Sequence, residues 1–288
     1  MIRNTLLATS ALFVVACMPQ EDMAETSMAN DDMAPAVMAD EADTMMVSYG
    51  DILSDDRRSA ENRARDQYRH PMETLAFFGL EPGMTVVEVT PGGGWYTEIL
   101  APAVGEEGIL YAANYPADLS DRAAAGAARF QEKLGSDPAY GNVQISEFAP
   151  DRMNVAPAGT ADLVLTFRNV HNWYMNDFAE DAFASFYTAL KPGGILGVVE
   201  HEMPETASDE MQKTSGYMKR SSVVAMAEAA GFELVEASDI NANPNDTADY
   251  EKGVWTLPPN YAEGDTDRDR YAAIGESNRM TLKFRKPA

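Results

Sequence analysis

The sequence predicts an α/β protein built on a doubly wound, mostly parallel seven-stranded sheet, with an N-terminal helical segment. Three observations predict this fold. Short β-branched apolar runs alternate with longer segments of helical spacing from about residue 84 to the C terminus. Most of these runs are nearly continuous in apolar character, which is typical of buried parallel strands. A glycine triplet, Gly92–Gly94, separates the first run from the helical segment that follows it.

The expected elements follow the chain in order. Residues 51–78 have helical spacing and dense charge, and His70-Pro71 divides them into two helices because a residue before proline disfavours the α conformation. Strands are expected at residues 84–89, 108–113, 143–148, 162–167, 195–200, 232–237 and 280–285. The other helices are expected at residues 96–104, 120–134, 178–190 and 221–230, the last ending at Gly231.

The composition excludes several classes of function. The chain has 288 residues, a formal net charge of −24 and 45% hydrophobic residues. That hydrophobic fraction is enough for a substantial core, and the negative charge argues against nucleic acid as a partner, because such partners favour a basic face. With one cysteine and three histidines, the sequence predicts neither an intramolecular disulfide framework nor a metal site.

The first 16 residues are typical of a secretory signal peptide. Arg3 supplies a positive charge, and an uncharged, mostly apolar stretch follows at residues 6–16, too short to span a membrane. The stretch ends VVAC, which resembles a bacterial lipobox and makes Cys17 the expected lipidation site. Met18 stands where the inner-membrane retention signal has Asp, so we expect a lipoprotein of the outer membrane facing the periplasm. A simple secretory signal is the alternative.

Residues 17–48 are expected to be a disordered tether between this anchor and a domain at residues 49–288. Residues 18–48 contain eight acidic residues and no basic one, and they are rich in Met and Ala. Such a segment buries too little apolar surface to offset its ordering entropy. A solvated linker, a Cu(I)-binding segment and an oxidant trap are all consistent with the methionines.

The glycine triplet lies in a motif that resembles a known family. Residues 86–97 read VVEVTPGGGWYT, and a strand that leads through glycines into a helix lets a ligand approach the backbone closely. Glu88, Gly92 and Gly94 match the acidic-x-Gly-x-Gly-x-Gly cofactor loop of class I S-adenosylmethionine-dependent methyltransferases, with Thr90 in place of the first glycine. The resemblance covers roughly residues 57–288 and includes three later motifs, ADLVL (161–165), LKPGGIL (190–196) and AGF (230–232).

Two branches of this family are the most similar. Residues 167–170, FRNV, resemble the quinone C-methyltransferases. The segments PGGGWYT (91–97) and HNW (171–173) resemble the often exported, predicted methyltransferases of bacteria.

The resemblance implies a role for each matching residue in binding S-adenosyl-L-methionine. The backbone at Gly92 and Gly94 would pass beneath the methionine part, and Glu88 would reach the amine. Asn114 takes the place of the acidic residue that usually binds the ribose hydroxyls, and Asp151 is expected to bind the adenine amine.

Residues 168–174, which follow the expected fourth strand, contain several side chains that could take part in catalysis or bind a substrate. The resemblance implies that acceptor-side residues lie at this position of the fold. His171 is the candidate general base, because its ordinary pKa lies near physiological pH, and His201 is a second candidate after the fifth strand. The expected substrate-binding residues are Arg168, Asn169, Trp173 and Tyr174.

Two further segments are candidates to cover the site. Residues 68–70 are expected to form either a lid or an ordinary surface helix, and residues 241–278 resemble a capping insertion. A metal shared by Glu200, His201 and Glu202 is not expected, because adjacent strand residues point to opposite faces.

Three functions stay open. The first is methyl transfer from S-adenosyl-L-methionine to a small-molecule acceptor by a lipid-anchored, exported protein. The predicted export opposes it, because this cofactor is made in the cytoplasm. The second is a methyltransferase-fold binding module or a non-methylating enzyme in the periplasm. The third is a metal or redox role of the methionine-rich tether.

Overall fold

The structure, a computed structural model, describes residues 50–288. The predicted signal peptide (1–16), the lipidation site Cys17 and the tether (17–48) lie outside the described residues and stay predictions. Within the described part, no helix combines the length and apolar character needed to cross a membrane.

A single seven-stranded sheet organises the chain, with the strand order β3-β2-β1-β4-β5-β7-β6. The strands are β1 (Thr85–Val89), β2 (Ile109–Asn114), β3 (Val143–Glu147), β4 (Ala161–Phe167), β5 (Leu190–His201), β6 (Glu233–Ser238) and β7 (Arg279–Arg285). Strands β1 to β5 pair in parallel, and β7 runs antiparallel to both β5 and β6. The predicted doubly wound, mostly parallel seven-stranded sheet is therefore confirmed.

Five of the helices begin and end close to the expected positions, whereas residues 51–69 form shorter helices than expected and the helix at residues 268–274 was not expected. The helices are α2 (Ala60–Arg63), α3 (Asp66–Arg69), α4 (Pro71–Phe78), α5 (Thr97–Val104), α6 (Asp121–Leu134), α7 (Val170–Met175), α8 (Ala179–Ala189), α9 (Arg220–Ala229) and α10 (Arg268–Ile274), with 3₁₀ turns η1 (Ala117–Leu119), η2 (Pro138–Tyr140), η3 (Asp209–Lys213) and η4 (Gly253–Thr256). His70 adopts a left-handed conformation (φ 40°) between α3 and α4, so Pro71 starts a new helix as predicted. Helix α7 was not predicted, because its six residues are too few to show a helical period.

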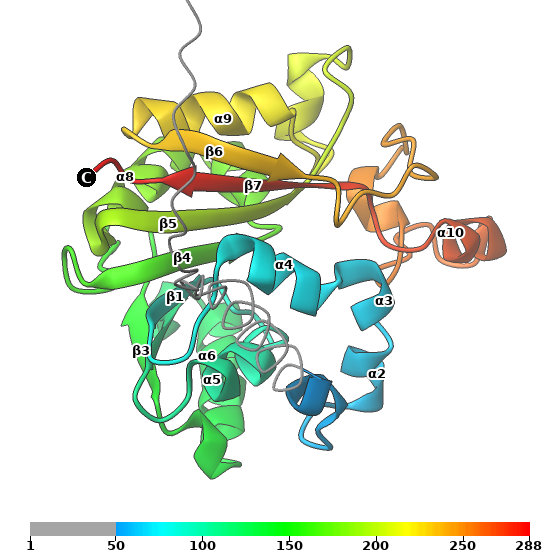
Figure 1. Ribbon diagram of the computed structural model, residues 1–288. Helices are drawn as coiled ribbons and strands as arrows, with labels where there is room; N and C mark the ends of the chain where they lie inside the picture. Colours follow the sequence, from blue (N-terminus) through cyan, green and yellow to red (C-terminus); the bar gives the residue numbers. More distant parts are fainter. Residues whose placement is uncertain (1–49) are drawn as a thin grey trace, which may run out of the picture. The chain divides into compact units, whose positions relative to one another are not determined.

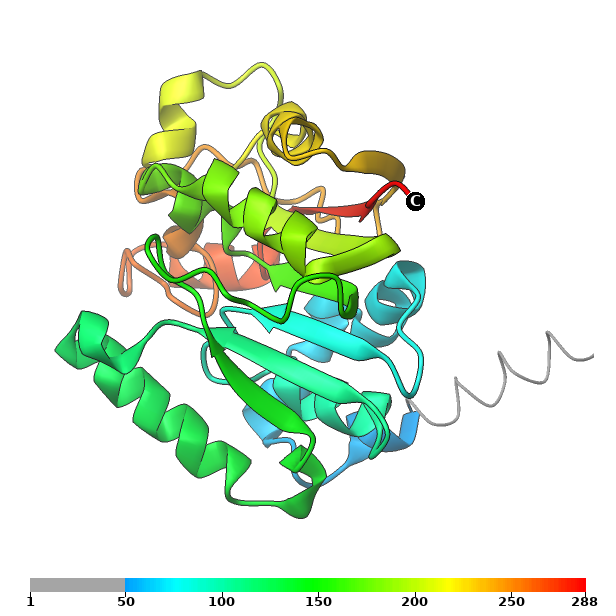
Figure 2. The ribbon, with the colours of Figure 1, turned by 90° about the vertical axis from the view of Figure 1, so that its left-hand side faces the viewer.

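Alternate residues of the strands face two apolar cores, one on each side of the sheet. Val87 and Val89 belong to the core that contains α8, whereas Val86 packs with α4 and α5 on the other face. Both views show helices on both sides of the sheet (Figure 1, Figure 2). Glu88, next to Val87 in the strand, is consequently turned towards the α5 side, where it is 2% exposed.

This topology determines where a ligand can bind. The chain winds outward in opposite directions from β1 and β4, which are neighbours in the sheet. In open α/β sheets the crevice lies at such a switch point, outside the carboxyl ends of the strands. The segments after β1 and after β4 therefore meet at one edge, and the α2–α3 segment and residues 276–279 are held beside them by ion pairs (Figure 1).

Candidate functional site

The loop after β1 is left-handed at three places. Thr90 (φ 54°), Gly92 (φ 59°) and Gly94 (φ 78°) all have positive φ, a conformation that costs a threonine more than a glycine. Open space lies above the α carbons of Gly92 and Gly93, whereas a Cβ on Gly94 would come within 3.0 Å of the Lys133 side chain. The loop thus offers bare backbone to a ligand at residues 92 and 93, while Gly94 is needed for packing against α6.

Two cavities adjoin this loop, and a third shares lining residues with both of them. The helix-side cavity, about 840 Å³, lies between the loop and α6, and its lining includes Thr90, Gly92, Gly93, Asn114, Tyr115, Ser120, Phe130, Lys133, Asn169, Asn172 and Asn176. The loop cavity, about 310 Å³, is lined by Glu88, Thr90, Gly92, Gly93, Trp95, Tyr96, Asn62, Arg65, Arg69, Arg168 and Asn169, among others. The arginine cavity, about 400 Å³, is lined by Arg65, Arg69, Arg122, Arg168, Arg279, His171, His201, Trp255, Leu257, Glu276 and Ser277, among others.

Glu88 lies where the resemblance placed it. Its carboxylate accepts a hydrogen bond of 2.6 Å from the hydroxyl of Thr97, the first residue of α5. Burial raises the pKa of Glu88 to about 7, against the opposing effect of the Thr97 hydrogen bond. A positively charged ligand in the loop cavity would favour the ionised carboxylate, so the residue suits an ammonium group.

The two residues expected to bind the nucleoside part have different outcomes. Asn114, the last residue of β2, lines the helix-side cavity, and its Oδ1 accepts the Tyr115 N–H at 2.9 Å, which leaves the amide N–H₂ for a ligand. The prediction for Asp151 was wrong in its placement. Its side chain is 76% exposed and lies 3.8 Å from Arg152, because residues 149–152 fold back in a bridged turn instead of extending along the cavity.

The acceptor-side predictions divide in the same way. Arg168 and Asn169 follow β4 and line the loop cavity, and the Asn169 amide donates to the Val89 carbonyl at 3.2 Å. Trp173 and Tyr174 line none of the three cavities; the full burial of Trp173 contradicts its expected contact with substrate, whereas the contact expected of Tyr174 stays a prediction. Helix α7 turns Trp173 into the core (0% exposed), and Tyr174 lies beneath the ammonium of Lys213.

The sequence did not single out Asn172 and Asn176, which line the helix-side cavity instead. Their spacing is the signal that would have found them, because residues four apart share one face of a helix.

His171 and His201 lie together at the arginine cavity, with their ring centroids 5.3 Å apart. The buried carboxylate of Glu200 lies 2.8 Å from His171 Nδ1 and accepts the His201 N–H at 2.7 Å. His201 Nδ1 lies 2.5 Å from the Ser277 hydroxyl. With Glu200 on Nδ1, the Nε2 atom of His171 is left as the acceptor of a proton, which is the arrangement of an oriented general base.

The same three side chains form the potential metal-binding group of the described residues. The candidate ligand atoms of His171, Glu200 and His201 all lie within 4.8 Å of one another, so the expectation that strand alternation keeps Glu200 and His201 apart was wrong. His201 is the last residue of β5, where the alternation ends. The neighbouring charge disfavours a cation, since burial, His171 and Arg279 hold the pKa of His201 well below its usual value.

The arginines come from segments far apart in the sequence. Arg69 and Arg279 are each 2% exposed, and Glu276 (4% exposed) accepts from Arg65 at 2.6 Å, from Arg69 at 3.3 Å and from Arg279. Burial acts to raise the pKa of Glu276, but these cations together with Arg168 lower it to about 2. Burial and the charge of Arg168 lower the pKa of Arg69 to about 8, so this guanidinium stays mainly protonated at pH 7.

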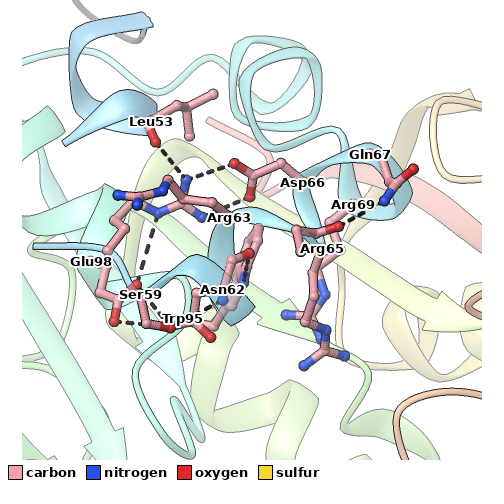
Figure 3. A network of polar contacts seen from close by, with 12 residues as sticks. Leu53, Ser59, Asn62, Arg63, Arg65, Asp66, Gln67, Arg69, Trp95 and Glu98 are labelled. Atoms are coloured by element: carbon pink, nitrogen blue, oxygen red, sulfur yellow. Dashed lines mark hydrogen bonds and ion pairs between the residues drawn. The ribbon is translucent and has the colours of Figure 1, made fainter. Parts of the chain in front are cut away.

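A polar network fixes the segment that brings Arg65 and Arg69 to the site. Asn62 donates to both oxygens of Glu98 at 3.0 and 2.9 Å, and the Trp95 indole N–H donates to the Asn62 carbonyl at 3.0 Å. Figure 3 shows these contacts joining the N-terminal helices to the residues around the loop. The Arg69 guanidinium lies over the Trp95 ring, 4.5 Å from its centroid. Of the two interpretations of residues 68–70, the lid is therefore supported at Arg69.

The predicted cap also contributes to the site. Residues 241–278 supply Trp255, Leu257 and Glu276 to the arginine cavity, and the Trp255 ring meets His171 edge to face, with centroids 6.2 Å apart. Tyr261 does not line this cavity; Arg268 covers its ring.

Comparison with known proteins identifies the fold. No protein-family model matches the sequence, and no curated protein matches it. The solved structures that match include an S-adenosylmethionine-dependent methyltransferase from Aquifex aeolicus, the [4+2]-cyclase SpnF, and phosphoethanolamine N-methyltransferase 2 of Haemonchus contortus in complex with S-adenosyl-L-methionine.

The three matches are similar in quality. The Aquifex protein has a TM-score of 0.53 at 16% identity, over 77% of this chain and 93% of its own. SpnF has a TM-score of 0.55 at 17% identity, over 88% and 94%, and the Haemonchus enzyme one of 0.52 at 16% identity, over 77% and 53%. The chain therefore has the class I methyltransferase fold, as predicted.

Proposed function

We propose that this protein binds S-adenosyl-L-methionine in the helix-side and loop cavities and transfers its methyl group to a small molecule held in the arginine cavity. The observation that carries the proposal is the position of His171. Its Glu200-bound imidazole lines a cavity that shares Arg65, Arg69 and Arg168 with the loop cavity.

The residues around the loop fit the cofactor. Gly92 and Gly93 leave open space above their backbone, and Thr90, Gly92, Gly93 and Asn169 line both the helix-side and the loop cavity, so one extended ligand can occupy both. Glu88 would hold the ammonium group, because an ion pair offsets the burial of its carboxylate. The free amide N–H₂ of Asn114 would bind the ribose hydroxyls.

The chain's own residues would prepare the acceptor. When bound, the cofactor supplies an electrophilic methyl group. Glu200 fixes the His171 ring, and Nε2 would take the proton of a hydroxyl, amine or other neutral nucleophile. Trp255 and the rest of the cap would limit the access of water to the acceptor.

The proposal includes export and anchoring through Cys17 in the outer membrane, facing the periplasm. It rests on the lipobox-like VVAC at residues 14–17. The strongly negative chain favours a small molecule over a nucleic acid as acceptor.

Several observations favour a second function, a binding module or a non-methylating enzyme of the same fold. Thr90 holds a left-handed conformation where the family has glycine, and Asn114 replaces an acidic residue. SpnF, whose fold this chain shares, is named as a [4+2]-cyclase. The predicted export also favours this second function, because the cofactor is made in the cytoplasm.

Calorimetric titration of the full-length chain with S-adenosylmethionine and S-adenosylhomocysteine separates the two functions. We expect binding that Gly92→Arg abolishes, because the new side chain would fill the open space above the loop. Gly159→Arg is the matched control, since Gly159 (φ 66°) is also left-handed and open but lines none of the three cavities. Absence of binding at millimolar ligand would refute the methyltransferase proposal in favour of the second function.

A further inference from the structure

The arginine cavity concentrates positive charge in a chain whose net charge is −24. Its lining includes one carboxylate, Glu276, and five guanidinium groups: Arg65, Arg69, Arg122, Arg168 and Arg279. Arginines on an acidic protein are expected to pair with its many carboxylates. The excess at this cavity therefore calls for an anion that the chain itself does not supply.

Glu276 does not satisfy these cations. It is within hydrogen-bond distance of Arg65, Arg69 and Arg279, but Arg168 Nη1 lies 3.9 Å from its nearer oxygen. One carboxylate neutralises one of the four guanidinium groups around it. Arg122, on the exposed start of α6, adds a fifth charge at the rim.

Two buried donors in this cluster also lack a partner. Arg69 Nη1 and Arg279 Nε are shielded from solvent and make no hydrogen bond within residues 50–288. Both side chains are 2% exposed and both line the cavity. Buried guanidinium N–H groups are costly to leave unsatisfied, so they indicate where oxygen atoms of a ligand bind.

The cofactor's own carboxylate would not remove the excess. Arg65, Arg69 and Arg168 also line the loop cavity, so one or two of them can hold that group, whereas Arg279 lines only the arginine cavity. With Glu276 and one further carboxylate in place, two of the four inner guanidinium groups remain uncompensated. The second anion must come from another molecule.

The rest of the cavity wall combines apolar residues of the cap with the two histidines and three neutral polar residues, Asn172, Asn260 and Ser277. Val254, Trp255, Leu257 and the two prolines that follow come from the cap, and the His171 ring meets Trp255 edge to face. A ligand that fits has an acid group at one end and an apolar or aromatic body.

We propose that the arginine cavity binds a small organic acid, whose carboxylate or phosphate oxygens lie on Arg168, Arg69 and Arg279 and whose apolar body packs on Trp255. The inference rests on the proposed function in one respect, namely that this acid is the methyl acceptor and presents its nucleophile to His171. Binding of the acid itself does not depend on the cofactor.

Tryptophan fluorescence of the full-length chain tests the inference with three probes: benzoate, phenyl phosphate and benzamide, the last a neutral match to benzoate. We expect at least one anion to bind about tenfold or more tightly than benzamide. Arg168→Gln should remove that preference and leave benzamide unchanged, and Arg168→Lys should restore part of it. Tighter binding of benzoate or of phenyl phosphate identifies the carboxylate or the phosphate as the preferred group.

Two further variants keep the test sound. Arg285→Gln is the control, because Arg285 is half exposed and pairs with Glu233 away from the cavity. If Arg168→Gln does not fold, Arg122→Gln is used instead: Arg122 is exposed and should tolerate the change, and because it lines both the arginine cavity and the helix-side cavity, loss of its charge should weaken both anions relative to benzamide.

Three results would overturn the inference. They are binding of benzamide as tight as that of both anions, no binding of either anion at millimolar concentration, and displacement of the anion by S-adenosylhomocysteine together with an equal loss of both ligands in Arg168→Gln. The last would show that the arginines serve the cofactor's carboxylate. Failure of the proposed function is distinct: the acid would bind, and S-adenosylhomocysteine would not.

Discussion

Replacing Glu276 by glutamine removes the one carboxylate at the centre of the arginine cluster. Against the raising effect of burial, the neighbouring arginines lower the pKa of this carboxyl from 4.5 to about 2, and a pKa lower by one corresponds to about 1.36 kcal/mol. Glu276→Gln should therefore reduce the free energy of unfolding by roughly 3 kcal/mol at pH 7. The stabilisation by a carboxylate of depressed pKa is complete above pH 4.5 and is lost as the pH falls towards 2.

Urea unfolding followed by circular dichroism at pH 7 and at pH 3 measures this difference. The two proteins should differ most at pH 7 and converge at the lower pH. Glu233→Gln is the control, because its ion pair with Arg285 is exposed and should contribute less than about 1 kcal/mol. A loss below 1 kcal/mol at pH 7, or a difference that does not change with pH, would refute the reasoning from the arginine cluster.

Three further predictions concern the site and the anchor. Burial raises the pKa of Glu88 to about 7, so ionisation of this carboxyl destabilises the folded protein as the pH rises from 4.5 through 7. In urea unfolding, Glu88→Gln should therefore stabilise the free protein by up to about 3 kcal/mol at pH 8.5 but by little at pH 4. An equal effect at both pH values would contradict this prediction. His171→Asn should lower the rate of S-adenosylhomocysteine formation with a bound acceptor by about 10²–10⁴-fold, while calorimetry shows the affinity for S-adenosylhomocysteine unchanged; unaltered turnover would exclude His171 as the base. Cys17→Ser should abolish partition into the detergent phase, and retained partition would argue against lipidation.

Local sequence was enough to predict the sheet. The run at Thr85–Val89 is mostly β-branched and the run at Ala161–Phe167 is mostly apolar, and a strand buried on both faces needs little more than that. Glycine and proline mark the turns, so the order of elements followed directly. The loop residues Glu88 and Gly92 could be placed for the same reason, because a strand, a glycine turn and a helix are contiguous in sequence.

The orientation of side chains within short segments between the strands was not predictable. Trp173 and His171 are two residues apart in a segment without apolar periodicity, which turned out to form α7. Only the helix and its packing decide that Trp173 enters the core and His171 reaches Glu200. Asp151 was misplaced for the same reason, since the bridged turn after β3 depends on contacts that no local pattern records.

The sequence by itself determined the fold, the cofactor-type loop after β1 and the candidate base at His171, because each depends on neighbours in the chain. The tertiary structure alone decided the character of the arginine cavity. Arg69 and Glu276 are 207 positions apart, and each has the sequence signature of an ordinary solvated charge. The fold brings both residues into one buried cluster with Arg168 and Arg279. Positive charge exceeds negative charge in this cluster, although the protein as a whole is acidic.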